Sequence, residues 1–304
     1  MNAIETHDLT RTYGRSDAVH GLTLSVPAGS VFAFIGPNGA GKTTTIRMLM
    51  NLLEPTRGEA RVLGADSRKL TPRERQRIGY VSENQKLPEW MTVEQLLRYC
   101  EPLYPTWDRE LERKLLKKFE LPADRKLKHL SRGMMMKAAL LASLAYRPEL
   151  LVLDEPFSGL DPLVRDEFIA GALEVSHQEK WTIFISSHDI NEVEQLASWV
   201  GLVEGGRLTL AEPTEDLLGR FRKVEVTVNG HDVNLVSAPE TWLEVQRDGN
   251  LVRAIETRYD PARLESYRRH KLGDAEVTVK PMTLRQIFVA MAKEGRAQGR
   301  DTAA

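Results

Sequence analysis

The chain contains short runs of consecutive apolar residues, each about as long as a β-strand. Between these runs lie segments in which the apolar residues are further apart. Val31 to Ile35 form one such run and predict a buried strand. The segment from Thr44 to Leu53 has apolar residues at helical spacing, which predicts a helix. Leu150 to Leu153 form a second run, typical of a central strand in a parallel sheet. The pattern therefore predicts an α/β fold.

The middle of the chain is predominantly helical in pattern. Thr92 and Gln95 are spaced as a capping box, which predicts a helix start. Leu111, Leu115, Leu116 and Phe119 fall on one face of a second predicted helix. We therefore expect a helical subdomain over residues 84–147.

A third helix is predicted from Ser131, as its cap, to a stop at Pro148. Its apolar stripe comprises Met134, Met135, Ala138, Leu141, Ala142 and Ala145. The methionines are expected to lie mostly in the core, with an interface as the alternative for Met134. A helix from Ser131 to Tyr146 would be roughly 24 Å long at about 1.5 Å per residue. This length places its start away from the chain's own strand-to-helix turn after Ile35.

The last third of the chain has a different pattern. Alternating valines at 224, 226 and 228 precede Asn229 and Gly230, a strong hairpin signal. Further strands are predicted around 243–245, 251–255 and 277–279, and helices after Asp260 and over 283–294. We expect a small α+β domain over residues 221–294, following a first domain of residues 1–220. Residues 295–304 are expected to be disordered.

Composition limits the possible partners and compartments. The 42 Lys and Arg residues nearly balance the 43 Asp and Glu residues, so no nucleic acid partner is expected. The single cysteine, Cys100, cannot form an internal disulfide and suggests a reducing compartment. No apolar stretch approaches the roughly 20 residues that span a bilayer, and the first residues lack a secretion pattern. We therefore expect a cytoplasmic protein.

The turn after the first predicted strand carries a phosphate-binding motif. Residues Gly36 to Thr43 match G-x-x-x-x-G-K-T, and the flanking strand and helix supply the context that the motif requires. Glycines let backbone N–H groups surround phosphates, the helix N-terminus adds about half a positive charge, and Lys42 adds a full one. Thr43 then offers its hydroxyl to Mg²⁺. A glycine-rich turn without a ligand is the alternative for this motif alone.

Two acids follow the second predicted strand. Asp154 and Glu155 would lie at the C-terminal edge of the sheet, where ligands bind in open α/β folds. Asp154 is expected to hold Mg²⁺ through its water shell, and Glu155 to orient or deprotonate an attacking water. Adjacent acids after a strand usually form a solvated loop. Together with the phosphate loop, however, they predict a hydrolysis site.

The order of five motifs resembles that of the ATP-binding subunits of ABC transporters over roughly residues 3–218: GPNGAGKTT, LSRGM, LLVLDEP, SGLD and SSHD. The resemblance implies two ATP molecules held between two head-to-tail nucleotide domains. Its implied contacts to ATP in the same chain are Tyr13 on adenine, with Gly36, Asn38, Gly39, Gly41, Lys42, Thr43 and Thr44 on the phosphates and Mg²⁺. Ser131 and Gly133 would contact the partner's ATP, Asp161 would lie at the shared interface, and His188 would touch the γ-phosphate.

Two motifs depart from the family pattern. In the signature, usually LSGGQ, Arg132 replaces a glycine and Met134 replaces the glutamine. Glu83 stands where the family has a glutamine that contacts Mg²⁺ and water, and Gln85 lies two residues later. We expect Arg132 to point away from or across the γ-phosphate rather than to block the site. Glu83 is a candidate Mg²⁺ ligand, although a carboxylate there repels the γ-phosphate.

The resemblance implies a P-loop NTPase core of ABC type with a helical subdomain, followed by the α+β accessory domain. The expected function is a Mg²⁺-dependent ATPase that forms a homodimer or heterodimer around ATP and drives a separate membrane permease. The last helix favours export over import. Such a subunit would be attached to the inner face of the membrane through the permease. The alternatives are an ABC-type ATPase, or a nucleotide-dependent regulator, that acts without a permease.

Overall fold

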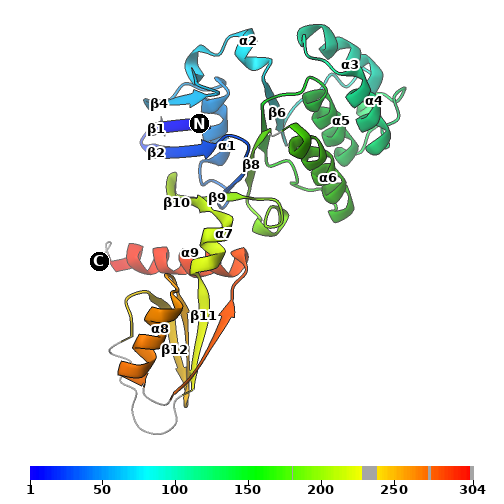
Figure 1. Ribbon diagram of the computed structural model, residues 1–304. Helices are drawn as coiled ribbons and strands as arrows, with labels where there is room; N and C mark the ends of the chain where they lie inside the picture. Colours follow the sequence, from blue (N-terminus) through cyan, green and yellow to red (C-terminus); the bar gives the residue numbers. More distant parts are fainter. Residues whose placement is uncertain (180, 228–237, 273–274, 302–304) are drawn as a thin grey trace. The chain divides into compact units, whose positions relative to one another are not determined.

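The computed structural model describes residues 1–179, 181–227, 238–272 and 275–301 (Figure 1). The chain divides into two compact units, Met1–Ala211 and Glu212–Ala304. The boundary falls within strand β10 (Arg207–Pro213). Helix α7 (Thr214–Arg220) therefore belongs to the second unit, although the sequence pattern assigned residues up to 220 to the first domain.

The first unit contains two sheets. One is antiparallel, in the order β2 (Ser16–Pro27), β1 (Asn2–Tyr13), β4 (Arg57–Val62) and β5 (Ala65–Asp66). The other has six strands, in the order β10, β9 (Trp199–Glu204), β3 (Val31–Ile35), β8 (Thr182–Ser187), β7 (Leu150–Asp154) and β6 (Ile78–Ser82). In this second sheet, the strands from β9 to β6 pair in parallel.

The parallel sheet brings the predicted motifs to one edge. Strands β3 and β7 confirm the two predicted buried strands. In register, Ile35 lies opposite Ser187, and Asp154 lies between Ser82 and Ser186. Because neighbouring strands run in the same direction, the loops after β3, β6, β7 and β8 all leave the same edge of the sheet.

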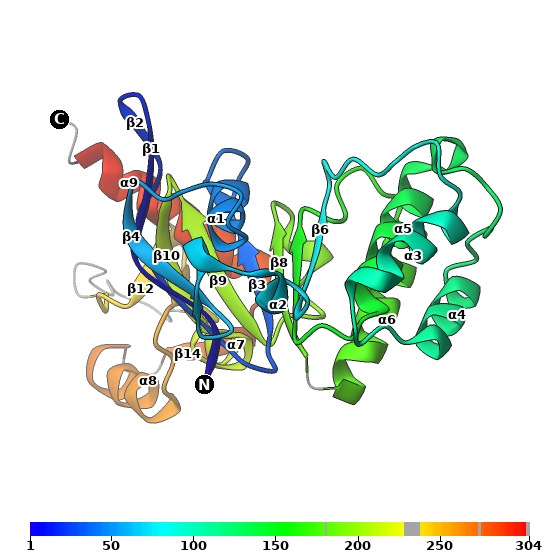
Figure 2. The same cartoon turned by 90° about the horizontal axis from the view of Figure 1, so that it is seen from above.

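The first unit also contains most of the helices. They are α1 (Lys42–Leu49), α2 (Pro72–Arg75), α3 (Val93–Cys100), α4 (Arg109–Lys118), α5 (Arg132–Leu144) and α6 (Pro162–Glu179), with short 3-10 helices at Ser67–Lys69, Glu101–Leu103, Leu127–His129 and Ile190–Glu192. Figure 2 shows α3, α4 and α5 gathered on the far side of β6 from the antiparallel sheet. All three helices lie between residues 84 and 147, where the sequence pattern is predominantly helical.

The predicted helix boundaries are partly confirmed. Thr92 forms the predicted capping box with Gln95 at the start of α3, and the Ser131 side chain caps α5 by accepting a hydrogen bond from the Met134 amide. Helix α1 begins at Lys42 and ends at Leu49, which is earlier at both ends than the apolar spacing predicted. Asn51, just beyond it, has a φ of 55°, a left-handed conformation that does not continue a helix.

The apolar stripe predicted on α5 is confirmed at Ala138, Leu141 and Ala145 and is wrong at its methionines. Met134 and Met135 are only half-buried, whereas Met136 is 5% exposed. The helix is enclosed for most of its length, because Ala138 to Leu141 are all buried. A helix that is buried nearly all round has no single apolar stripe, so spacing alone does not identify its most buried methionine.

Aromatic side chains fill the core between the sheets. Phe32, Phe34 and Phe184 are fully buried, and the Phe184 ring lies 5.7 Å from Phe32 and 5.3 Å from Phe34, centroid to centroid. They come from β3 and β8, the strands that lead into the phosphate-binding turn and the His188 loop. The core thus fixes the strands that carry the predicted chemistry.

The second unit begins with α7 and contains an antiparallel sheet in the order β12 (Trp242–Asp248), β13 (Leu251–Glu256), β11 (Arg222–Thr227) and β14 (Glu276–Pro281). Helix α8 (Pro261–Tyr267), the π-helix Arg268–Leu272 and helix α9 (Leu284–Asp301) complete it. The predicted strands and helices of this region are confirmed. The hairpin residues Asn229 and Gly230 lie outside the described residues.

Helix α9 corrects the expected C-terminal tail. It runs through the predicted start of disorder at residue 295 and ends at Asp301. The sequence KEGRAQGR contains Lys, Glu, Arg, Ala and Gln, which favour helix, and these residues outweigh its two glycines. Within the described ranges, no helix combines the length and apolar character needed to cross a bilayer.

Phe184→Ala is expected to lower the free energy of unfolding of the first unit by about 3–5 kcal/mol, because it leaves a cavity between β3 and β8. Urea transitions followed by hydrogen exchange in peptides from these strands would measure the change. The matched control is Leu163→Ala, since Leu163 is 68% exposed and should change stability by less than about 0.5 kcal/mol. Equal transitions for the two variants would contradict the assigned role of the aromatic core.

Candidate functional site

The turn between β3 and α1 depends on glycine at both ends. A Cβ at Gly36 would lie 2.2 Å from the Val203 carbonyl oxygen, and one at Gly41 would lie 2.3 Å from that of Ala18. Gly41 also has a φ of 98°, which side chains strongly disfavour. The phosphate motif is therefore a closely packed turn that leads into the N-terminus of α1, where anions are favoured.

Lys42 lies inside this turn. Its side chain is 5% exposed, and Nζ donates hydrogen bonds to the carbonyl oxygens of Gly36 at 2.6 Å and Pro37 at 3.0 Å. The same ammonium lies 3.0 Å from Glu155 Oε1. A buried cation needs such partners, and a phosphate could replace the carboxylate among them.

Asp154 is the buried acid of the site. It is 2% exposed, and its Oδ1 accepts hydrogen bonds from Thr43 Oγ1 at 3.0 Å and from Ser186 Oγ at 2.9 Å. Burial raises the pKa of Asp154 above its ordinary value of 3.8, although these hydrogen bonds act in the opposite direction. A buried carboxylate beside a threonine hydroxyl is an oxygen donor set that suits Mg²⁺ when phosphate oxygens complete it.

Glu155 connects Lys42 with His188. Its Oε2 lies 2.7 Å from His188 Nδ1, and its other oxygen pairs with Lys42. The Glu155 backbone has a φ of 51°, and its amide donates to Ser186 Oγ at 3.0 Å. This left-handed conformation is sparsely populated for a residue with a side chain, and the hydrogen bond to Ser186 supports it here.

The family resemblance also implies that Asn38, Gly39, Thr44 and Tyr13 contact ATP, and these residues differ in their exposure. Asn38 and Gly39 are exposed in the turn, and Thr44 is half-buried in α1. Tyr13 ends β1 and is 50% exposed, with the Arg11 guanidinium 4.7 Å above its ring. Thus Arg11 covers one face of the half-exposed Tyr13 ring, while hydrogen bonds and ion pairs connect Lys42, Thr43 and the acids at the sheet edge.

The signature residues have local structural roles that the sequence pattern did not show. Gly133 is buried, and a Cβ there would lie 2.7 Å from Val164 Cγ1 on α6. Asp161 Oδ1 accepts a hydrogen bond from the Val164 amide at 3.0 Å and so caps the start of α6. Gly133 therefore allows α5 to pack closely on α6, whereas Asp161 stabilises the start of α6.

The two departures from the family pattern meet in the structure. Arg132 Nη2 lies 2.5 Å from Glu83 Oε1, which also accepts a hydrogen bond from Ser158 Oγ at 2.9 Å. The Glu83 amide donates to the Asp154 carbonyl oxygen at 3.0 Å. Ser158 and Ser186 were not among the predicted site residues. Both could have been found from the five motifs, since Ser186 begins SSHD and Ser158 begins SGLD.

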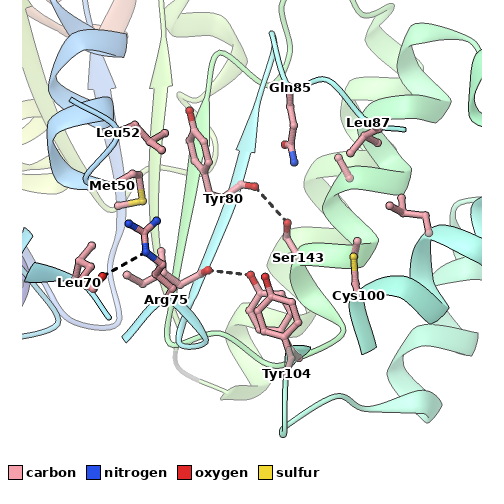
Figure 3. A pocket seen from close by; sticks show the side chains of 15 residues that line it. Met50, Leu52, Leu70, Arg75, Tyr80, Gln85, Leu87, Cys100, Tyr104 and Ser143 are labelled. Carbon is pink, nitrogen blue, oxygen red and sulfur yellow. Dashed lines mark hydrogen bonds between the residues drawn. The ribbon is translucent and has the colours of Figure 1, made fainter. Parts of the chain in front are cut away.

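Gln85 faces a separate hollow of about 300 Å³ between the parallel sheet and the helical subdomain. Figure 3 shows Met50, Leu52 and Tyr80 on one side, with Leu87, Cys100 and Tyr104 on the other. This groove, defined by those residues and Gln85, is lined by both apolar and polar side chains. Tyr104 stacks on Tyr146 with the ring centroids 3.8 Å apart, so one wall is rigid.

Comparison with known proteins decides the family. The profile of the family described as ABC transporter matches residues 19–158. The daunorubicin/doxorubicin resistance ATP-binding protein DrrA of Streptomyces peucetius is 32% identical over 95% of this chain and 89% of its own length. The chain belongs to the ABC transporter family. It is an ATP-binding subunit with the ATPase fold of that family.

Further relatives agree with this assignment. The bacitracin transport ATP-binding protein BcrA of Bacillus licheniformis is 35% identical over 72% of each chain. A solved structure of an ATP-binding subunit of an ABC transporter is 30% identical and superposes with a TM-score of 0.65, covering 71% of this chain and 91% of its own. The predicted P-loop NTPase fold of ABC type is therefore confirmed, as is the expectation of an ATP-hydrolysing transporter subunit.

The hydrogen bond that the His188 ring donates to the Glu155 carboxylate raises the pKa of His188 above its ordinary value of 6.5. Since the folded-state pKa is the higher one, the pair stabilises the folded chain fully below pH 6.5, and this stabilisation is lost as the pH rises through the folded-state pKa. Glu155→Gln is expected to return the pKa of His188 toward 6.5, as followed by NMR titration of the ring. A pKa of His188 that the substitution leaves in place would contradict this cause.

Proposed function

We propose that this ABC transporter subunit hydrolyses MgATP at the cluster of Lys42, Thr43, Asp154, Glu155 and His188, as part of a dimer that drives a separate permease. The single observation that supports this most is the position of Glu155. Its carboxylate joins Lys42 in the phosphate loop to His188 after the next strand, with Asp154 alongside. A purely structural ion pair would not require this convergence of three motifs.

Each residue has a role that its position supports. Lys42 exchanges its contact with Glu155 for phosphate oxygens when ATP binds. Thr43 and Asp154 would hold Mg²⁺, and the bound ion would neutralise phosphate charge. Released from Lys42, Glu155 orients the attacking water and accepts its proton. His188 donates to the γ-phosphate and, through Glu155, keeps a positive charge near the site.

The partner chain completes the site. Ser131 caps α5, and its exposed position leaves the positive end of that helix open to an anion. A solved dimeric structure of the bacterial ABC transporter cassette MJ0796 is 23% identical, and its TM-score of 0.63 supports a shared fold. We infer that ATP joins the phosphate loop of one subunit to α5 of another, in a homodimer or a heterodimer.

Glu155→Gln is expected to trap the ATP-bound dimer, because glutamine cannot accept the proton of the attacking water while the binding groups remain. Light scattering with MgATP should show a mass close to twice that of the nucleotide-free protein, and steady-state hydrolysis should fall by a factor on the order of 100 or more. The matched control is Glu155→Gln combined with Lys42→Ala, which should remain monomeric. A Glu155→Gln protein that stays monomeric with MgATP would reject the dimer mechanism.

The permease binds at the groove lined by Leu52, Leu87 and Tyr104. The proposal rests on family membership, since ABC transporter subunits act with a membrane component, and on the apolar rim of this hollow. Leu52 is 56% exposed and lies on that rim. Trp90 and Tyr99, at 68% and 60% exposed, belong to the same helical subdomain. Burying such side chains against a partner removes apolar area from water.

The transported direction is export. DrrA is named for drug resistance and BcrA for bacitracin transport, and this chain resembles both over most of its length. The C-terminal unit strengthens the comparison with DrrA, since that alignment covers 95% of the chain. Through the permease, the subunit is attached to the inner face of the membrane, and the cargo is selected by the permease.

Leu52→Glu is expected to abolish co-purification of the permease from detergent-solubilised membranes, because it places a charge where an apolar contact forms. The affinity of the purified subunit for ATP should change by less than about twofold, since Leu52 lies outside the nucleotide cluster. Val289→Glu, at a 48% exposed position of α9, is the matched control and should retain the permease. Retention of the permease by Leu52→Glu would place the docking surface elsewhere.

A further inference from the structure

Two charges replace two neutral residues of the family pattern, and they are found in contact. Glu83 occupies the position of the usual glutamine, and Arg132 that of a signature glycine. In the structure, Arg132 Nη2 and Glu83 Oε1 are 2.5 Å apart. The positive charge of Arg132 thus balances the negative charge of Glu83, although the two residues are far apart in the sequence.

The ion pair of Arg132 and Glu83 lies beside the nucleotide site, where an unbalanced negative charge would oppose phosphate. The Glu83 amide donates a hydrogen bond to the Asp154 carbonyl oxygen. The backbone of Glu83 therefore lies beside that of the buried acid of the nucleotide site. Ser158 Oγ donates to the same Glu83 oxygen at 2.9 Å. A Cβ at Gly159 would lie 2.9 Å from Arg132 Nη1, so the guanidinium covers this loop. Arg132 therefore lies between the loop after β6 and the loop after Glu155.

Electrostatics indicates which property the pair controls. Without Arg132, the Glu83 carboxylate would add to those of Asp154 and Glu155 near the entering triphosphate, and like charges would oppose binding. The side chains of Arg132 and Glu83 are 50% and 28% exposed, so an ion pair here contributes little to folding stability. Its effect is expected in ATP affinity rather than in the stability of the fold.

We propose that Arg132 is a positioning residue that acts through Glu83: it neutralises this carboxylate and holds it away from the phosphates, so that ATP can bind. The inference rests on the proposed nucleotide site. It differs from two other roles for Arg132, direct contact with ATP on the partner subunit and steric blocking of the site. The three roles differ in whether the effect of Arg132 depends on Glu83.

A double-mutant cycle on the full chain separates these roles. Arg132→Ala is expected to weaken MgATP binding by about 3- to 10-fold, measured as the Kd by calorimetry, because it leaves the Glu83 charge exposed. Glu83→Gln should bind ATP at least as tightly as the wild type. In the double variant, Glu83→Gln should offset most of the loss caused by Arg132→Ala, and Arg132→Lys should retain most of the affinity.

Salt provides a second readout. The ratio of Kd between Arg132→Ala and the wild type should shrink as the salt concentration rises from about 50 to about 500 mM, because the repulsion acts through partly exposed charges that salt screens. The matched control is Arg98→Ala, which removes an ion pair of 2.6 Å with Glu94 on α3 and should leave the Kd unchanged. A merely structural role of Arg132 would show neither the salt dependence nor the rescue by Glu83→Gln.

Three results would overturn the inference. If Arg132→Ala costs the same affinity in the Glu83→Gln variant as in the wild type, Arg132 contacts nucleotide directly. A many-fold rise in hydrolysis in Arg132→Ala would show that the arginine blocks the site. An unchanged Kd in Arg132→Ala would show that the pair has no electrostatic role. A wild-type chain that binds no MgATP would instead reject the proposed function itself, before the cycle is measured.

Discussion

The ammonium group of Lys42 lies within a turn of backbone, bonded to two carbonyl oxygens and to the Glu155 carboxylate. A charge buried to this degree is tolerated only with partners on several sides. That requirement fixes the geometry around it: glycines at both ends of the turn, β3 and α1 flanking it, and β7 delivering an acid within reach. The nucleotide site is therefore built around one cation that must always be paired, by Glu155 or by phosphate.

The parallel sheet supplies the alignment that this pairing needs. Strands β6, β7 and β8 end in register, so Glu83, Glu155 and His188 leave the same edge although long segments of chain separate them. The phenylalanines of β3 and β8 lock two of these strands together in the core. The packing of these phenylalanines thus helps to hold the strands in the register that brings the charged groups together at the edge of the sheet.

The sequence predicted those parts of the site that are locally encoded. The phosphate turn, the acids after β7 and the cap at Ser131 each depend on a few adjacent residues, and the structure has all three. The buried methionine of α5, Met136, was missed because a helix enclosed on most sides carries no clear apolar stripe. The contact between Glu83 and Arg132 could not be derived, because it depends on how two distant loops fold together. The sequence showed that Glu83 and Arg132 have opposite charges, but it did not show that their side chains are in contact.

The absence of a side chain at Gly133 determines how the signature helix can move. A methyl group there would press on the side chain of Val164, so the backbone of α5 lies directly against a side chain of α6. Surfaces packed this closely resist sliding, because they interlock. A displacement of α5 at Gly133 is therefore expected to press on Val164 and so on the first turn of α6.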